Sequence, residues 1–259
     1  MNSLPEPTDL IDFVVDIATG AGDITLEYFQ DSDLEVEQKA DGTPVTAADK
    51  LAERFLRDQI HARFPDDGIV GEEEADVAGM TGRSWIIDPI DGTKSFTAGV
   101  PLYANLIAVV EHDEPILGLI NLPALGEMVW ATAGGGAFQN SEPCQVSSTA
   151  DLSEAYVMTS ELGYWPQGAL ERLTIEGISV RTWGDAYGYA LVATGRAAAM
   201  VDPLANIWDV APMKVILEEA GGAFTSLAGQ RSVADGSGVG SNGVIHDDLM
   251  RLLPEAGRA

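Results

Sequence analysis

The sequence has few of the residues that build disulfides, zinc sites and basic surfaces. Among 259 residues there is one cysteine, Cys144, and there are three scattered histidines. This excludes an intramolecular disulfide and a cysteine-based zinc cluster. Lysine and arginine number 14 against 41 acidic residues, which gives a formal net charge of −27. Nucleic acid and anionic membranes repel a surface of this sign, so we expect neither as a partner.

Long apolar runs are also missing. No stretch approaches the roughly 20 consecutive apolar residues of a membrane helix, and "MNSLPEPTDL" lacks the basic and then apolar segments of a signal peptide. We therefore expect a cytoplasmic protein. The composition, 46% hydrophobic, is sufficient for a large core in one domain or two closely packed ones. Adaptation to a salty, halophilic cytoplasm is one explanation for the acidic excess, and a solvated acidic face is the other.

The apolar spacing in the first half predicts two helices followed by strands. The helices cover residues 8–28 and 46–64, and the second is expected to begin at Thr46 and to bury Leu51, Phe55, Ile60 and Phe64. Short strands follow in "DGIVGEEE" and "SWIIDPIDG". Three further apolar segments, separated by short turns, are typical of an antiparallel meander.

Near residue 145 the pattern changes to strands that alternate with helices, as in an α/β layer. We therefore predict two closely packed units, residues 1–145 and 146–259. The Gly-rich stretch 234–243 is predicted to be a loop before a last helix that starts near residue 246.

Three apolar runs end in acids, in "IVGEEE", "WIIDPIDGTKSF" and "IWDVA". The acids are Glu72 with its two neighbours, Asp88 with Asp91, and Asp209. Half-buried carboxylates need a cation or hydrogen-bonding partners, because desolvating the charge is costly. Oxygen donors without nearby histidine or cysteine favour Mg²⁺ or Mn²⁺ over zinc.

Gly92 and Thr93 follow the second aspartate of "DPIDGT". If a helical turn begins there, its free N–H groups form a seat for phosphate beside the metals. Metals beside a phosphate seat indicate phosphoryl chemistry with an activated water. Asp-Gly-Thr alone is more often an ordinary turn, but the matching contexts of Glu72 and Asp209 favour the site.

Together "GEEE", "WIIDPIDGTKSF" and "IWDVAPMKVILEEAGG" resemble the motifs of the inositol monophosphatase family, Mg²⁺-dependent and lithium-sensitive phosphatases, over nearly the whole chain. The resemblance implies an α+β fold, a five-layer αβαβα sandwich of the inositol monophosphatase and fructose bisphosphatase type. It also implies a homodimer and two or three Mg²⁺ ions, for which Mn²⁺ can substitute.

The resemblance also assigns roles to individual residues. Glu72, Asp88 and the Ile90 carbonyl would hold a first ion, and Asp88, Asp91 and Asp209 a second, while a third, weaker ion would use Glu72. Gly92 and Thr93, beside Asp91, would bind phosphate through their amides. Glu72 and the Thr93 hydroxyl would orient the attacking water. Asp49 matches an acid that hydrogen-bonds this threonine, although an aspartate at that helix position also fits a role at the helix start alone.

The second half carries the information on substrate. "RTWGDAYGYALVATG" resembles the histidinol-phosphate phosphatase branch, and Lys94 fits both that branch and the bisphosphate nucleotidase branch. Asp185 and Asp202 align with substrate-facing positions, where two acids suit the amine and imidazole of histidinol. Asp185 as a mere helix N-cap is the alternative. Asn206 is a further candidate contact.

These residues favour a metal-dependent phosphomonoesterase that hydrolyses the small ester L-histidinol phosphate, in histidine biosynthesis. The alternatives are inositol-1-monophosphatase, a 3′(2′),5′-bisphosphate nucleotidase, and a non-catalytic metal- or phosphate-binding protein. The combination of Glu72 and Thr93 speaks against the last, because binding alone needs no water-activating pair.

Overall fold

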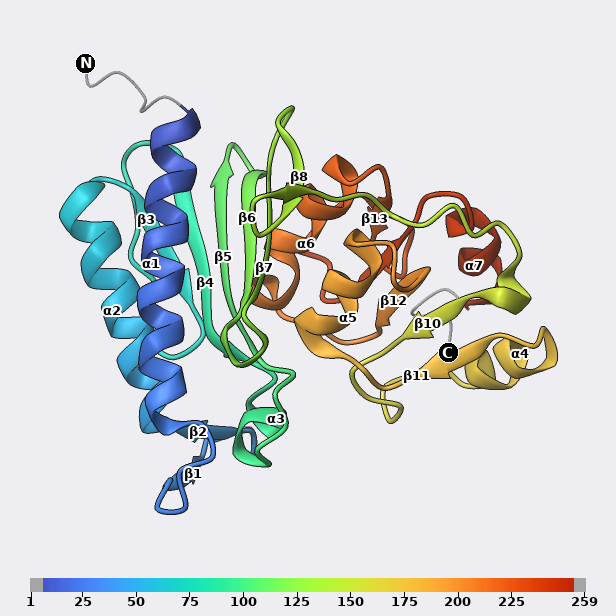
Figure 1. Cartoon of the computed structure of the whole chain (residues 1–259), viewed down its shortest axis with the longest axis horizontal. Coiled ribbons are helices and arrows are strands. Elements are labelled where there is room, and N and C mark those ends of the chain that lie inside the picture. The colour runs from blue at the N-terminus through green and yellow to red at the C-terminus, as the bar shows by residue number, and fades with distance from the viewer. Residues whose placement is uncertain (1–6, 254–259) are drawn as a thin grey trace.

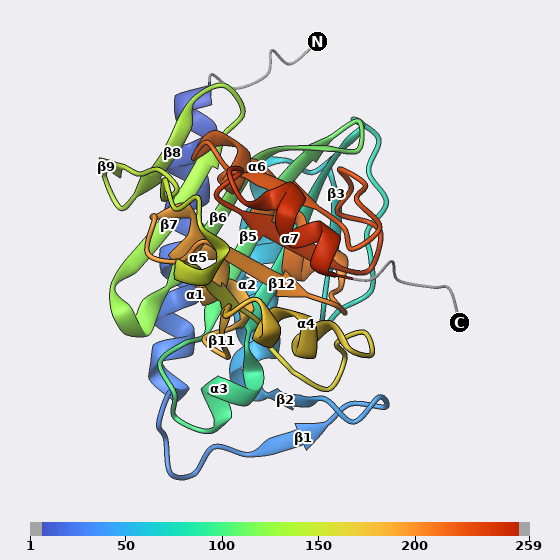
Figure 2. The same ribbon diagram turned by 90° about the vertical axis from the view of Figure 1, so that its right-hand side faces the viewer.

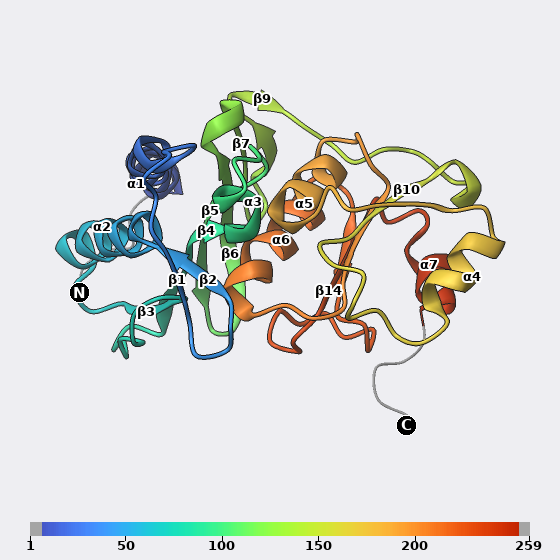
Figure 3. The same ribbon diagram turned by 90° about the horizontal axis from the view of Figure 1, so that it is seen from below.

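Two large β-sheets with helices on both faces, and one small two-stranded sheet, make up the molecule that the computed structural model describes, residues 7–253 (Figure 1). The helices fall into three layers, an outer pair on the larger sheet, a middle pair, and an outer pair on the smaller sheet: α1 (Pro7–Tyr28) and α2 (Ala47–Arg63), α5 (Asp185–Ala193) and α6 (Ile207–Glu219), and α4 (Ala169–Ile175) and α7 (His246–Leu252). Figure 3 shows these layers from below. The predicted five-layer αβαβα sandwich is confirmed.

The larger sheet has seven strands in chain order. They are β3 (Gly68–Gly71), β4 (Arg83–Asp91), β5 (Ala104–Glu111), β6 (Glu114–Leu122), β7 (Glu127–Thr132), β8 (Gly136–Gln139) and β9 (Glu142–Pro143). Only β3 and β4 are parallel, and the remaining neighbours form the predicted antiparallel meander. Side chains alternate between the faces, so Trp85 and Ile87 pack with α1 and α2 while Ile86 packs with α5 and α6.

Helix α2 begins where the sequence predicts, but its buried face differs in part. The Thr46 hydroxyl accepts a hydrogen bond from the N–H of Ala48 at 3.2 Å and caps the helix. Leu51, predicted to be buried, is 45% exposed, whereas Leu56 and Ile60 are fully buried. Nine residues separate Leu51 from Ile60, which is two and a half turns, so the two side chains leave opposite sides of the helix.

The smaller sheet has the order β11-β10-β12-β14-β13. Its strands are β10 (Tyr156–Met158), β11 (Ser179–Arg181), β12 (Ala199–Asp202), β13 (Ala223–Thr225) and β14 (Gly238–Ser241). From β10 to α6 strands and helices alternate as predicted, and β10 is parallel to both β11 and β12. Figure 2 looks onto this sheet with α4 and α7 in front of it.

The prediction of a loop over residues 234–243 is wrong, because this stretch contains β14. The strand is buried and pairs with both β12 and β13. A Cβ atom on Gly240 would lie 2.4 Å from Leu217 Cδ1, so only glycine lets α6 pack this closely on the strand. Here the glycines mark close packing of the backbone and not a loop.

Helix α6 lies between the two sheets and is buried along most of its length. Its residues Val210, Met213 and Leu217 belong to a core that also includes Leu106 of the larger sheet and Met200 of the smaller one.

The boundary near residue 145 stays a prediction. Within residues 7–253 no helix combines the length and apolarity needed to cross a membrane.

A hairpin and a short helix lie at the end of the larger sheet where β4 stops. The hairpin consists of β1 (Val36–Gln38) and β2 (Pro44–Thr46), and the helix is α3 (Thr93–Thr97). Figures 1 and 2 show the hairpin and α3 side by side. The "DPIDGT" motif therefore lies between the sheet and this hairpin.

Candidate active site

The first part of the site is a bulge at the end of β4. The pairing of β4 with β5 shifts between Asp88 and Asp91, and the N–H of Ile90 donates to Asp88 Oδ1 at 2.9 Å. Asn105 on β5 donates from Nδ2 to the Pro89 carbonyl at 2.7 Å, which ties the bulge to the neighbouring strand. Both aspartates are buried. The bulge thus turns two carboxylates of one strand toward the same side.

Asp209 reaches the same place from the second half of the chain. It lies in the first turn of α6, where its Oδ2 accepts a hydrogen bond from the Asn206 N–H at 2.6 Å. One carboxylate oxygen each from Asp88, Asp91 and Asp209 lies within 4.8 Å of the others. The structure therefore brings together three predicted metal ligands.

The three carboxylates are crowded, and no basic side chain in the described part of the chain pairs with them. Burial, then repulsion from neighbouring acids, raises the pKa of Asp88 and of Asp91 well above the usual range, and burial raises the pKa of Asp209 to about 7. Within residues 7–253, no lysine or arginine hydrogen-bonds any of them. An oxygen-only donor set under this repulsion fits a hard divalent cation.

Glu72 lies just beyond the end of β3 and is tied to a lysine that we did not predict. Lys39, in the loop of the β1–β2 hairpin, donates from Nζ to Glu72 Oε1 at 2.7 Å and to Glu73 Oε1 at 2.5 Å. Glu72 is outside the group of three, but its charge is the second-largest cause of the raised pKa of Asp88. Lys39 thus bridges the hairpin and the acidic site. No apolar period surrounds "EQKADG", so no local pattern indicates a role for Lys39.

Gly92 begins α3 in the left-handed conformation with φ of 80°, and a Cβ atom there would lie 3.0 Å from Asp185 Oδ2. The Thr93 hydroxyl donates to the Ile90 carbonyl at 3.0 Å and lies 3.5 Å from Asp49 Oδ1. The other Asp49 oxygen accepts from both the N–H and the hydroxyl of Thr46. Asp49 therefore makes both proposed contacts, one at the helix start and one to Thr93.

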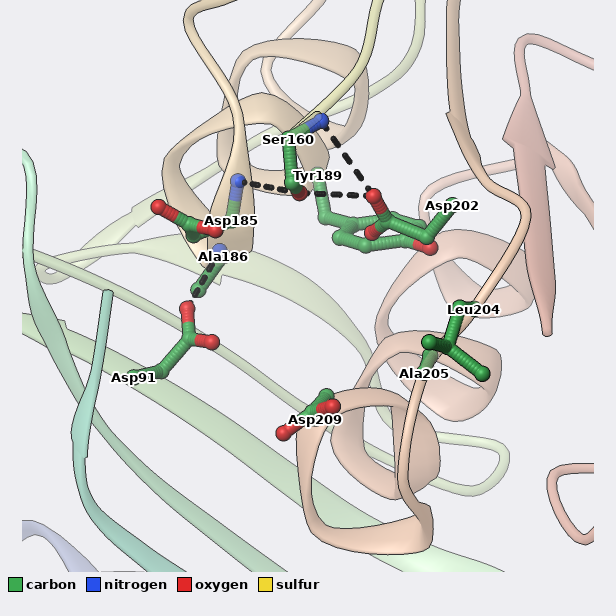
Figure 4. Close-up of a pocket in the computed structure, with 9 residues that line it drawn as sticks. All are labelled: Asp91, Ser160, Asp185, Ala186, Tyr189, Asp202, Leu204, Ala205 and Asp209. Atoms are coloured by element: carbon green, nitrogen blue, oxygen red, sulfur yellow. Dashed lines mark hydrogen bonds between the residues drawn. The ribbon is translucent and has the colours of Figure 1, made fainter. Parts of the chain in front are cut away.

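A cavity of about 80 Å³ opens beside these residues (Figure 4). Its lining combines acids from both halves of the chain with Ser160, Tyr189 and a short apolar edge: Asp91, Ser160, Asp185, Ala186, Tyr189, Asp202, Leu204, Ala205 and Asp209. Asp185 and Asp202 thus share one space with two of the three clustered carboxylates. Asn206 and Lys94 are not among the lining residues, and Lys94 pairs with the exposed Glu161 at 2.9 Å.

Asp185 is the first residue of α5, so the alternative that it is the N-cap is wrong, since Gly184 holds that position. Its φ of 53° is in the left-handed region, which is uncommon for a non-glycine residue. The Ser160 hydroxyl accepts from the Asp185 N–H at 2.9 Å and donates to Asp202 Oδ1 at 2.6 Å. One serine therefore links the two candidate substrate acids, as the dashed lines in Figure 4 show.

Two further features of the lining were not predicted. The Ala186 N–H donates to Asp91 Oδ2, which joins α5 to the carboxylate cluster. The buried Tyr189 hydroxyl has no hydrogen-bond partner among the residues described. Burial raises the pKa of Asp202 to about 7, with the charge of Asp185 adding to the shift. This end of the cavity thus offers buried acceptors to a cationic ligand.

The comparisons with known proteins agree with this geometry. A family model described as "Inositol monophosphatase family" matches residues 6–258. The chain is 44% identical to a histidinol-phosphatase of Chlorobaculum parvum, over 94% of this chain and 96% of that protein. It is 39% identical to a histidinol-phosphatase of Mycobacterium tuberculosis, covering 92% and 95% of the two chains. The solved structure of an IMPase of Thermotoga maritima superposes with a TM-score of 0.87 at 34% identity, over 94% and 96% of the chains.

Proposed function

The chain belongs to the inositol monophosphatase family, and we propose that it is a metal-dependent phosphatase that hydrolyses L-histidinol phosphate to L-histidinol and phosphate. The observation that carries the substrate assignment is the shared cavity. Asp91 and Asp209 of the carboxylate cluster line it together with Asp185 and Asp202. One substrate can therefore contact the metal end and the second pair of acids at once.

At the metal end, Asp88, Asp91 and Asp209 would hold one divalent cation, and Glu72, Asp88 and the Ile90 carbonyl another, with Glu72 contributing to a third. A bound cation supplies an activated water and neutralises the phosphate charge. The residues of the chain hold and orient the reactants. The amides of Gly92 and Thr93 face the phosphate, and Glu72 with the Thr93 hydroxyl aligns the water.

The threonine is itself oriented by two acceptors in the structure. Its hydroxyl lies 3.0 Å from the Ile90 carbonyl and 3.5 Å from Asp49 Oδ1. Asp49 is fixed in turn by the two Thr46 donors. We propose that Asp49 acts through Thr93, holding its hydroxyl in one orientation for the water.

At the other end of the cavity, Asp185 and Asp202 suit a cationic group of the substrate. Asp202 is buried and Asp185 half-buried, and the charge of Asp185 helps to raise the pKa of Asp202, so the pair suits a protonated amine. An uncharged inositol ring would leave both carboxylates without a counter-charge. A nucleotide bisphosphate would bring a second phosphate to acids that repel it. The charge of the cavity therefore favours histidinol phosphate over both alternatives.

A substrate panel tests the proposal. Purified protein in Mg²⁺ should give a higher kcat/KM with L-histidinol phosphate than with inositol 1-phosphate or a 3′,5′-bisphosphate nucleotide. A preference for inositol phosphate would replace the substrate assignment and leave the chemistry. No turnover of any ester, p-nitrophenyl phosphate included, would favour the non-catalytic binding protein.

We further propose that the cations are Mg²⁺, two or three per chain, with Mn²⁺ able to substitute, and that the protein is a cytoplasmic homodimer. Isothermal titration of metal-free protein with Mg²⁺ measures the number of ions. Light scattering measures the oligomeric state, and a monomer at assay concentration would contradict the dimer.

A further inference from the structure

Helix α2 buries an ion pair on the face that also carries Leu56 and Ile60. Glu53 is fully buried and Arg57, one turn later, is 8% exposed. Arg57 donates from Nε to Glu53 Oε1 at 2.8 Å. Burying two charges costs more than an apolar pair would, unless further hydrogen bonds use the remaining donors and acceptors. The partners of this pair therefore indicate its purpose.

All those partners belong to the backbone of one loop. Glu53 accepts the N–H of Glu73 on Oε2 at 2.8 Å and the N–H of Glu74 on Oε1 at 2.9 Å. Arg57 donates to the carbonyls of Glu74 at 2.9 Å and Ala75 at 3.1 Å. Two side chains thus hold four backbone groups of three consecutive residues. We call this arrangement the clamp.

The clamp starts one residue after Glu72. On the other side of Glu72, Gly71 is fixed by the pairing of β3 with β4, opposite Ile87 and therefore next to Asp88. Gly71 also touches the clamp, because a Cβ atom there would lie 2.5 Å from Glu53 Oε1. The backbone of Glu72 is consequently held on both sides, by the sheet and by the clamp.

We propose that Glu53 and Arg57 are positioning residues that set the place of the Glu72 carboxylate relative to Asp88. This inference rests on the role proposed for Glu72 in the reaction. It differs from a purely structural role, in which the pair would only attach α2 to the sheet. Every hydrogen bond that the pair makes outside itself goes to the backbone of the loop.

A second ion pair between the same helix and the same loop provides the matched control. Arg54 donates to Glu74 Oε1 at 2.9 Å, but it contacts only the side chain and is 69% exposed. Arg54→Met removes a charge pair between α2 and the loop without touching the loop backbone. Ile60→Ala is the second control, because it destabilises α2 from a buried position and removes none of the hydrogen bonds of the clamp.

The test variants are Arg57→Met and the double variant Glu53→Leu/Arg57→Met. The double variant guards against failure to fold, because replacing both members of a buried pair by apolar residues is often neutral for stability. The assays are kcat and KM for p-nitrophenyl phosphate, the Mg²⁺ concentration for half-maximal activity, and amide hydrogen exchange at Glu73 and Glu74. A generic ester keeps the outcome independent of the histidinol assignment.

We expect kcat to fall about 10- to 100-fold in both test variants, as for residues that orient a metal ligand, with KM nearly unchanged. The Mg²⁺ requirement should rise, and amide exchange at Glu73 and Glu74 should become faster. Arg54→Met should match the wild type, and Ile60→Ala should lower only the thermal midpoint.

A folded double variant with wild-type kcat and Mg²⁺ requirement would overturn the proposal and leave the clamp a structural one. Unchanged amide exchange at Glu73 and Glu74 would overturn it too, because the loop would then be held by something else. If the wild type hydrolyses no ester, the proposed function fails. The clamp is then judged by exchange and by Mg²⁺ binding in a calorimeter.

Discussion

Carboxylates are buried in two kinds of surroundings in this molecule. Glu53 in the clamp and Asp67 at the start of the larger sheet each have basic and neutral donors; Asp67 accepts from Thr81 and Trp85, with Arg83 at 3.7 Å. Within residues 7–253, Asp88, Asp91 and Asp209 each accept one backbone hydrogen bond, pair with no basic side chain, and lie beside further acids. Beside Glu53 and Asp67 the fold itself supplies a basic side chain. Where three acids crowd together without one, the cation has to come from solution.

The largest effect that tests this comparison is the removal of one crowded carboxylate. Asp88→Asn should reduce kcat by at least about 10²- to 10³-fold, the loss typical of a preorganised electrostatic contact. The thermal midpoint in EDTA should nevertheless stay equal or rise, because a repulsion is gone. Arg57→Met should do the opposite to stability, since breaking a buried pair costs about 3–5 kcal/mol. Equal destabilisation by both substitutions would contradict the comparison.

The acids at the other end of the cavity are expected to give the next largest effect. Asp185→Asn should raise KM for histidinol phosphate about 10- to 100-fold, because a charge-assisted hydrogen bond is lost. KM for p-nitrophenyl phosphate, which has no amine, should change little. Glu161→Gln is the control, because it removes a nearby carboxylate that binds Lys94 outside the cavity. Equal changes with both esters would remove Asp185 from the substrate contacts.

The effect of pH on stability should be smaller than the effects of these substitutions. It should also depend on whether the metal is bound. Burial raises the pKa of Asp202 and Asp209 to about 7 in the folded protein, above an unfolded value of about 3.9. The folded state therefore binds protons more tightly, and the stability gained by protonation is complete below about pH 4 and lost as pH rises through about 7.

In EDTA the thermal midpoint should accordingly fall between about pH 5.5 and pH 8, by about 2–4 °C for each kcal/mol lost. Saturating Mg²⁺ should flatten the fall, because the bound cation favours the ionised carboxylates. Asp209→Asn should reduce the slope in EDTA. A thermal midpoint in EDTA that stays constant or rises with pH would contradict the raised pKa values of these carboxylates.

The smallest expected effect concerns the surface acids. The net charge of −27 predicts self-repulsion at low ionic strength, where the Debye length is about 30 Å at 0.01 M and about 3 Å at 1 M. With Mg²⁺ constant, the thermal midpoint should rise steadily between about 0.05 M and about 2 M KCl. A rise that continues after screening saturates would support salt adaptation. A flat or falling midpoint would defeat it.

Much of this fold was predictable because period and motif coincide. The helix over 46–64, the meander and the clustering of Asp88, Asp91 and Asp209 follow from apolar runs that end in acids. The sequence analysis did not predict the clamp, although its residues lie on the buried face of α2. Glu53 is three residues before Leu56, and Arg57 is three residues before Ile60. The spacing of apolar residues shows which face of a helix is buried. Only the folded structure shows that a loop packs on that face.

Other features left no local signal at all. Ser160 has its role only because α5 brings the Asp185 N–H to it from across the cavity. Strand β14 is rich in glycine because helices press against it, and a glycine-rich stretch without structural neighbours is typical of a loop. Both features, the role of Ser160 and the glycines of β14, depend on contacts between residues that are far apart in the sequence.

The position of Asp209 at the start of α6 also has a kinetic consequence. Its carboxylate meets Asp88 and Asp91 only after a helix of the second half has entered the space beside the larger sheet. We therefore expect the repulsion, and its relief by a cation, to arise late in folding. Interactions that are absent from the transition state change the rate of unfolding and leave the rate of folding nearly constant. In stopped-flow measurements Mg²⁺ should slow unfolding in urea and barely alter the rate of refolding. The ion would then prolong the lifetime of the folded protein without helping it to form.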